Sequence, residues 1–208
     1  MATQLLPIFP LSFVLLPAMP LPLHIFEDRY KEMMNDIINA GDEFGVVLAK
    51  EDGIVNIGCS AKIERILNRY DDGRLDLIAV GQRRFQISTL DQDKSYLRAE
   101  VNYFNDDDPA DASAELNQKA AAAYRELLRI EHPGMQEEAA LEGPCVSFQL
   151  AQLIRDLDKR QTILSLRSEV ERLEFLVKIM PDYVLRQERT ALAKRVGPQN
   201  GHAKGSLP

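Results

Sequence analysis

Side chains able to carry out chemistry are few and scattered in this sequence of 208 residues. Cys59 and Cys145 are its two cysteines, and they lack the CxxC spacing of a redox or zinc motif. The three histidines, His24, His132 and His202, fit no HExxH or similar ligand pattern. We therefore expect free thiols, no metal site and no cofactor.

Carboxylates and serines offer no assembled active site either. Adjacent acidic residues occur in Asp71-Asp72 and Glu137-Glu138, but such pairs in turns or on polar helix faces are usually solvated. Ser168 opens the stretch SEVE, which has the form of a helix capping box. Because a nucleophile, a base and oxyanion donors cannot be assembled from these residues, we predict that the chain is not an enzyme.

The charge pattern disfavours nucleic acid as the main partner. The formal net charge is −7, whereas non-specific binding to nucleic acid depends on many phosphate contacts by Lys and Arg. Residues 60–104 nevertheless carry a slight positive balance, from Lys62, Arg65, Arg69, Arg74, Arg83, Arg84 and Arg98. Arg65, Arg69 and Arg83 are the candidate basic face, so RNA binding is retained as an alternative function.

The most apolar stretch, between residues 5 and 26, contains five prolines. A membrane-spanning helix needs about 20 helix-compatible apolar residues, and each interior proline costs about 3 kcal/mol. The stretch also lacks the positive start and small-residue cleavage pattern of a signal peptide. We therefore predict extended strands and tight loops of the mature fold, no membrane contact, and a cytoplasmic location with reduced thiols.

The elements that position these residues can be predicted from hydrophobic periodicity. Residues 26–41 have apolar residues at helical spacing, and Gly41 supplies the stop. Residues 43–104 alternate as five or six strands, with a turn at Asp71-Asp72-Gly73 and a break at Gly81. Such strands with little helix between them predict a small closed or nearly closed barrel.

The second half of the chain is predicted to be helical. The acidic stretch NDDDPADAS marks a solvated connection, in which Asp111 or Ser113 caps the next helix. Further helices follow, and Pro181 is expected to end or kink the last one. The predicted organisation is a β-domain over residues 1–104, a linker over 105–113, a helical domain over 114–196 and a disordered tail over 197–208.

Several of these stretches together resemble the amino-terminal, substrate-binding domain of Lon proteases, in the form of stand-alone Lon-domain and cereblon-like proteins. The matching stretches are LPIFPLSFVLLPAMPLPLHIFEDRY, GVVLA, IGCSAKIERI, DDGRLDLIAVGQRRFQI and YLRAEV, and more weakly QTILSLRSEVERLEFL. The resemblance implies an α+β fold: a PUA-like β pseudo-barrel with an embedded helix, followed by a carboxy-terminal helical bundle.

The residues that carry the family pattern are mostly expected to be structural. Glycines permit close backbone approach or positive φ, and Phe26 and Phe85 are expected to fill the core. The motif residues are Pro20, Leu21, Phe26, Arg29, Tyr30, Asp72, Gly73, Gly81, Arg84 and Phe85. The phosphate-binding pattern of the Lon ATPase is absent from the sequence, so proteolysis is not expected of this chain.

The resemblance implies a non-catalytic module that binds unfolded or peptide segments of client proteins, with a separate protease as a further partner. The loop VLLPAM supplies apolar side chains for this role if it lies on the surface. The candidate peptide-binding residues are Leu15, Leu16, Met19, Met33 and Met34. Two alternative roles stay open: these residues seal the barrel or a homodimer contact, or the chain is a structural scaffold.

Overall fold

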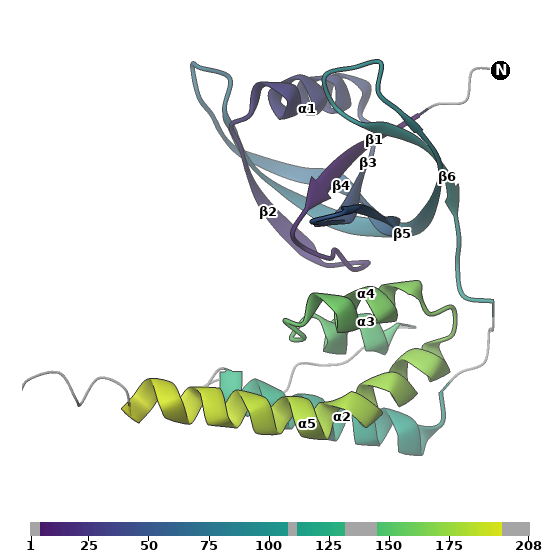
Figure 1. The fold of residues 1–208 in the computed structure, drawn as a ribbon, viewed down its shortest axis with the longest axis vertical. Coiled ribbons are helices and arrows are strands. Elements are labelled where there is room, and N and C mark those ends of the chain that lie inside the picture. Colours follow the sequence, from purple (N-terminus) through teal and green to yellow (C-terminus); the bar gives the residue numbers. More distant parts are fainter. Residues whose placement is uncertain (1–4, 108–111, 132–144, 197–208) are drawn as a thin grey trace, which may run out of the picture.

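The computed structural model describes residues 5–107, 112–131 and 145–196, which form a β-barrel above a layer of helices (Figure 1). The first part contains the strands β1 (Leu6–Leu11), β2 (Pro20–Ile25), β3 (Phe44–Lys50), β4 (Gly53–Arg69), β5 (Leu75–Asp91) and β6 (Arg98–Tyr103), with α1 (Asp28–Ala40) between β2 and β3. The second part contains α2 (Ala114–Glu131), α3 (Val146–Ala151), α4 (Leu157–Ser165) and α5 (Glu169–Val196).

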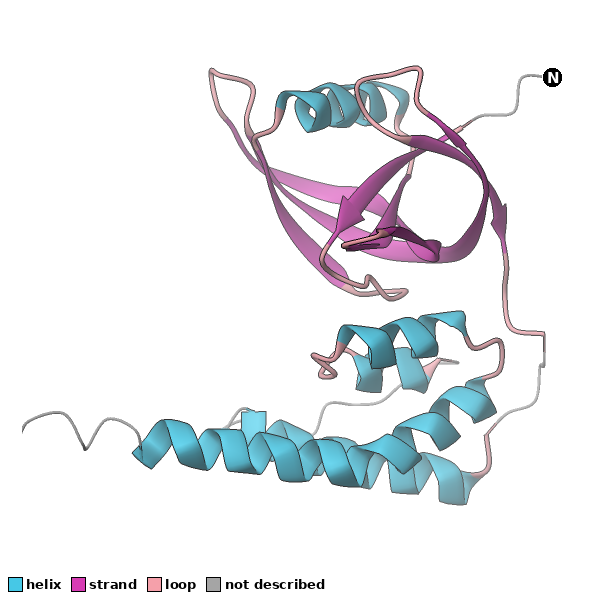
Figure 2. Cartoon of the chain, in the orientation of Figure 1, coloured by secondary structure: helices cyan, strands magenta, loops and turns pink. Residues whose placement is uncertain are grey.

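The six strands form one sheet that curls into a barrel in the order β2-β5-β4-β3-β1-β6. Closure comes from β5, whose first half pairs with β2 and whose second half pairs with β6. Figure 2 shows the strands enclosing a common interior, with the helices outside them. This arrangement confirms the predicted pseudo-barrel with an embedded helix followed by helices.

The helix α1 covers one end of the barrel because its apolar side faces the interior. Met33, Met34 and Ile37 are buried, and the ring of Tyr30 lies 4.4 Å from that of Phe9 on β1. The helix ends as predicted at Gly41, which adopts a left-handed φ of 72°. The helix predicted within residues 26–41 is thus confirmed, and its apolar side is packed against the barrel interior.

The predicted break at Gly81 is wrong. Residue 81 lies inside β5, which continues without interruption to Asp91. A Cβ atom at Gly81 would lie 2.1 Å from the carbonyl oxygen of Leu16, so the glycine permits the loop after β1 to pass directly over the strand. The turn at Asp71-Asp72-Gly73 is confirmed, with φ of 85° at its glycine.

The helices after the barrel occur in the order predicted from the sequence, but the last of them is longer than an end at Pro181 would allow. Ser113 caps α2 by accepting a hydrogen bond from the Leu116 N–H at 3.2 Å. Helix α5 does not end at Pro181 but continues to Val196, and it bends along its length (Figure 1). None of the helices in the described part of the chain combines the length and apolar character that a membrane crossing requires.

The largest apolar cluster is continuous from the barrel interior into the helical layer. It includes Phe44 and Leu77 from the sheet together with Ile163, Leu173 and Leu176 from α4 and α5. The division into a domain at 1–104 and another at 114–196 therefore stays a prediction. Parts of the predicted linker and the whole predicted tail lie outside the described residues.

Candidate functional site

A groove opens where the barrel lacks a ladder between β1 and β2. In the described structure β2 pairs with β5 alone, and residues 8–11 of β1 pair with β3. The groove has a volume of about 240 Å³ and is lined by Phe9, Pro10, Leu11, Leu23, His24, Ile25, Phe26, Glu27, Arg29 and Tyr30. We call it the β1–β2 groove. Sites that enclose small molecules usually have volumes of about 300–1,000 Å³, so this groove is too small to enclose one. It is better suited to part of a larger ligand that extends beyond it.

Phe26 is the most exposed large apolar side chain of the barrel. It was expected in the core, but 59% of its surface is accessible, so that expectation is wrong. The residue follows the last residue of β2, where Ile25 takes the inward position and Phe26 points outward. Its ring stacks on His24 at 5.9 Å, which gives the groove an aromatic edge.

Charged groups at the groove are paired with one another. The guanidinium of Arg29 contacts the carboxylate of Glu27 at 2.8 Å and lies 4.5 Å from the centre of the Tyr30 ring. His24 contacts Asp76 at 2.6 Å, and the Tyr70 hydroxyl donates to the same carboxylate. Hydrogen bonds from His24 and Tyr70 hold the pKa of Asp76 below its usual value. The groove thus combines apolar walls with a rim whose polar groups bond to one another.

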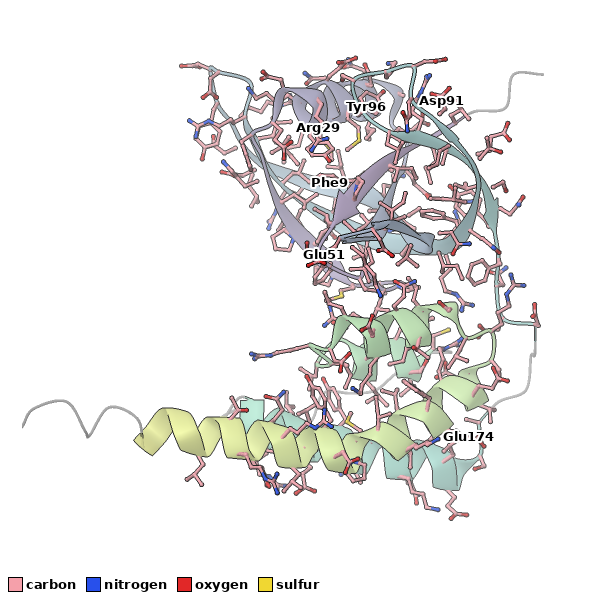
Figure 3. The ribbon with its side chains drawn as sticks, viewed as in Figure 1. Phe9, Arg29, Glu51, Asp91, Tyr96 and Glu174 are labelled. Atoms are coloured by element: carbon pink, nitrogen blue, oxygen red, sulfur yellow. The ribbon has the colours of Figure 1, made fainter. Side chains whose placement is uncertain are left out.

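Figure 3 labels Arg29 near the start of α1 and Phe9 on β1 below it, and both residues line the groove. Three motif residues, Phe26, Arg29 and Tyr30, line the same groove. The sequence motif alone did not show which of them bind a ligand and which only support the fold. Phe26 and Arg29 are exposed, whereas Tyr30 is buried. The outward position of Phe26 was not evident from the sequence, because its register relative to β2 depends on where that strand ends.

The candidate peptide-binding residues lie elsewhere. Leu15 and Leu16 are 1% and 0% exposed, and Met33 and Met34 are fully buried. Met19 is partly buried and packs against the core. The loop lies over Gly81 with its leucines turned inward, which favours the alternative that these residues seal the barrel. A client role for these residues stays a prediction, and the native surface does not present four of them.

The candidate basic face is partly neutralised. Arg65 and Arg69 are exposed on β4, whereas Arg83 contacts Glu43 at 3.1 Å and lies 3.9 Å from the centre of the Tyr103 ring. Arg84, which belonged to the same basic region of the sequence, is 5% exposed and points into the protein. The structure therefore does not gather these arginines into one open patch that would favour RNA.

Arg84 belongs to a buried cluster between the barrel and the helices, which we call the polar joint: Arg84, Asp106, Glu169 and Arg172. The two nitrogens at the end of the Arg172 guanidinium each donate to Asp106 at 2.6 Å, and one also donates to Glu169 at 2.8 Å. Arg84 donates to Asp106 at 2.5 Å. The sequence pointed to Arg84 only, since its partners are far away in the chain.

Electrostatics and packing make the polar joint a structural element. Burial alone would raise the pKa of Asp106, but the hydrogen bonds and charges of Arg172 and Arg84 hold this pKa below its usual value. The Phe148 ring lies 4.4 Å below the Arg172 guanidinium, and Ser147 bonds to both Glu169 and Arg172. All members are thus supplied with partners, as a buried ion pair requires.

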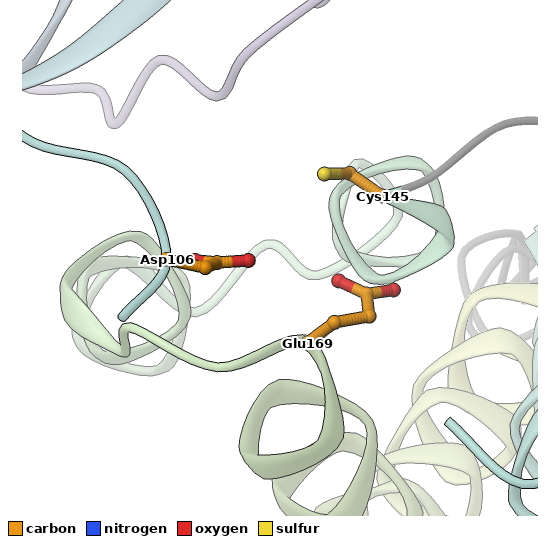
Figure 4. A group of neighbouring side chains, drawn as sticks. All are labelled: Asp106, Cys145 and Glu169. Atoms are coloured by element: carbon orange, nitrogen blue, oxygen red, sulfur yellow. The ribbon is translucent and has the colours of Figure 1, made fainter. Parts of the chain in front are cut away.

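Three side chains near the polar joint have atoms of metal-ligating type: Asp106, Cys145 and Glu169, with ligand atoms within 4.8 Å of one another (Figure 4). Arg84 and Arg172 already supply the positive charge that balances the carboxylates of Asp106 and Glu169. Burial and the nearby Glu169 raise the pKa of the Cys145 thiol, which disfavours the thiolate that binds metal. This donor set does not fit a metal ion unless the ion pairs break.

A second apolar depression lies on the helical layer. It measures about 630 Å³ between α2 and α5, with Val177, Met180, Val184 and Leu185 among its walls. Leu185 is 45% exposed. Lys119, Glu126 and Glu188 are the charged residues of the lining. This surface is the main structural competitor to the β1–β2 groove as a place where an apolar chain could bind.

Comparisons with known proteins give one consistent result. The family described as "ATP-dependent protease La (LON) substrate-binding domain" matches residues 5–182. The Lon N-terminal domain protein from Xanthomonas campestris superimposes with a TM-score of 0.69 and 29% identity, covering 84% of this chain and 98% of that chain. The N-terminal domain of Mycobacterium avium complex Lon protease, 20% identical, matches with a TM-score of 0.64 over 86% of this chain and 100% of its own, and supports the fold alone.

Curated relatives are much longer proteins. The Lon protease of Roseiflexus castenholzii is 26% identical over 96% of this chain but over only 29% of its own length. The Lon protease of Flavobacterium johnsoniae is 25% identical over 80% of this chain and 22% of its own length. This chain thus spans less than a third of the length of these relatives.

Proposed function

The chain belongs to the family of the Lon substrate-binding domain, and from this membership we propose that it binds extended apolar segments of client polypeptides in the β1–β2 groove. It acts in this role as a binding module without catalysis of its own. The observation that carries the proposal is Phe26: a motif aromatic that is 59% exposed beside an apolar groove. The ring and the apolar walls of the groove are contiguous, and contiguous exposed apolar surface is where interaction sites are found.

The chemistry of the groove suits an uncharged apolar segment. Glu27 and Arg29 neutralise each other, and the Asp76 carboxylate is hydrogen-bonded by His24 and Tyr70, so the polar groups of the rim already have partners within the chain. Phe9, Leu23 and Tyr30 provide the apolar floor. Aromatic side chains dominate binding energies at such surfaces, because they bury much area with few rotatable bonds.

The test is fluorescence anisotropy at physiological salt, with a labelled polypeptide kept unfolded by reduction and alkylation of its cysteines. Phe26→Ala should weaken binding about tenfold or more, the usual range for an aromatic hot spot. Its melting temperature should stay unchanged, because the side chain is exposed. Folded protein should not compete, and structured RNA should not compete either.

Two matched variants make the test specific. Leu90→Ala removes another exposed apolar side chain from the barrel, 44% accessible and outside the groove, and should leave affinity unchanged. Leu185→Ala probes the α2–α5 depression. Loss of binding in Leu185→Ala with full binding in Phe26→Ala would contradict the proposal. A change of oligomeric state in Phe26→Ala, measured by sedimentation, would instead assign Phe26 to a contact between copies.

A further inference from the structure

A chain of side-chain contacts leads from the barrel surface to the aromatic edge of the groove. The Tyr70 hydroxyl donates to one oxygen of the Asp76 carboxylate at 2.7 Å, and the Nδ1 atom of His24 lies 2.6 Å from the other oxygen. The His24 ring stacks in turn on Phe26, with 5.9 Å between the ring centres and 23° between the ring planes. Residues of β2, of β5 and of the turn between β4 and β5 thus support the Phe26 ring.

The position of the mobile proton in this chain of contacts follows from the chemistry of Asp76. Hydrogen bonds from His24 and Tyr70 hold the pKa of Asp76 below its usual value, so the carboxylate stays ionised and can only accept hydrogen bonds. The Nδ1 atom of His24 therefore carries a hydrogen, and Nε2 is the atom that gains or loses a proton. The side chain of His24 is 49% exposed, so the ring can exchange this proton with solvent.

Asp76 differs from the neighbouring carboxylates in the charge of its partners. Three of these carboxylates each contact a Lys or Arg, in the pairs Glu27–Arg29, Asp28–Lys31 and Asp72–Arg74. Asp76 contacts an imidazole and a phenol instead, and the register of β4 places the uncharged Asn68 opposite it. After His24 and Tyr70, Arg74 acts on Asp76 only through space, because its guanidinium contacts Asp72. Within the described part of the chain, the charge of Asp76 is therefore matched by a contacting cation only when His24 is protonated.

We propose that His24 is a positioning residue through which proton uptake strengthens client binding at the β1–β2 groove. This inference rests on the proposed function and adds its regulation. Protonated His24 completes the ion pair with Asp76, and its ring lies within the roughly 6 Å over which an aromatic ring attracts a cation. Phe26 is then held at the groove, and a side chain that is already ordered loses less entropy on binding. Client affinity should therefore rise as the pH falls from about 8 to about 5.5, where histidines commonly change charge.

The test compares the wild type with His24→Gln at about pH 8 and about pH 5.5 and at constant ionic strength. The probe is the reduced and alkylated, labelled polypeptide of the anisotropy test. Glutamine can still donate to Asp76 but cannot take up a proton. The ratio of the two affinities cancels the titration of the client, because both proteins bind the same client. The two proteins should bind alike at about pH 8, and the wild type should bind about threefold more tightly or better at about pH 5.5.

The other histidines of the chain provide the matched control. A double variant with His132→Gln and His202→Gln keeps His24 as its only histidine and should retain the wild-type pH profile. Asp76→Asn removes the other half of the ion pair and should reduce the pH dependence.

The outcomes separate the regulation from the proposed function. An affinity ratio between wild type and His24→Gln that is equal at both pH values would overturn the proposal, as would an unchanged pH dependence in Asp76→Asn. The proposed function would then still stand if Phe26→Ala weakens binding at both pH values. Full binding by Phe26→Ala would instead contradict the proposed function itself.

Discussion

The polar joint and the β1–β2 groove both contain an arginine of the family motif, and they treat it in opposite ways. Arg84 in the joint is 5% exposed and shares buried carboxylate and carbonyl acceptors with Arg172. Arg29 at the groove has a side chain that is 52% exposed and contacts one neighbouring carboxylate. In the joint, hydrogen bonds within the chain satisfy the polar groups, whereas strand edges and an aromatic ring stay accessible at the groove.

This difference teaches which motif residues maintain the fold and which are available to a ligand. Buried polar groups are costly unless paired, so the complete pairing of the joint is expected of a structural contact. An exposed aromatic beside unpaired strand edges has no such structural need. Changes in the joint should therefore lower stability, and changes at the groove should lower binding.

The largest effect is expected when the joint loses its central cation. Arg172→Met leaves the carboxylates of Asp106 and Glu169 without their main partner, and removal of one partner of a buried pair costs about 3–5 kcal/mol. The value should fall near the lower end, because the Asp106 side chain keeps 20% exposure. Urea unfolding measures the loss. Asp158→Ala, which removes the exposed contact with Lys50, is the control and should change nothing measurable.

The next effect concerns the loop that was expected to bind clients. Leu16→Ala removes a fully buried side chain and should lower the free energy of unfolding by about 2–5 kcal/mol. Binding of the unfolded polypeptide, measured below the melting transition of the variant, should be retained. Lost affinity with unchanged stability would instead assign Leu16 to client binding. It would contradict the distinction between a structural loop and a binding groove.

A smaller loss is expected at Gly81. Alanine there would bring its Cβ to 2.1 Å from the Leu16 carbonyl oxygen, and overpacking of this kind costs about 1–3 kcal/mol. The loop after β1 must shift to relieve the contact. Thermal unfolding would record the resulting loss of stability as a lower melting temperature. A variant with wild-type stability would mean that close approach is not what glycine provides at this position.

The smallest effect is a dependence of stability on acid. The pKa of Asp106 is lowered in the folded protein, so its contribution is fully present above the unfolded value of about 3.9. That contribution is lost as the pH falls through the lower folded pKa. Asp106→Asn should therefore be less stable near neutrality and show a weaker acid dependence below about pH 4. An unchanged acid dependence would exclude Asp106 as its source.

Much of the fold could be predicted from sequence because hydrophobic period and turn residues are local signals. The helix that ends at Gly41, the turn at Gly73 and the cap at Ser113 follow from neighbouring residues alone. Gly81 was misinterpreted because the reason for a glycine there is a loop distant in sequence, and of the two outcomes expected at Pro181, an end or a kink, the end is excluded because α5 continues to Val196. Such outcomes depend on tertiary contacts that periodicity does not contain.

The candidate site was harder to predict than the fold. Leu16 was a candidate for client binding and Phe26 was expected in the core, yet the first is buried and the second exposed. The path of the loop over Gly81 turns Leu16 inward, and the end of β2 turns Phe26 outward. The joint was missed for a related reason: Arg84 and Arg172 meet at Asp106 only after the barrel and the helices have packed.

Hydrogen exchange at the His24 amide tests the central claim most directly. In the described structure β2 pairs with β5 alone, and the hydrogen bond from the Gly81 N–H to the Met19 carbonyl sets a phase in which the His24 N–H points away from β5. This N–H should therefore exchange rapidly in the free protein. Saturating unfolded polypeptide should slow its exchange at least tenfold in the wild type, and should have no such effect in Phe26→Ala. Unchanged exchange at His24, with protection appearing around Val184 in the α2–α5 depression, would contradict the assignment of client binding to the β1–β2 groove.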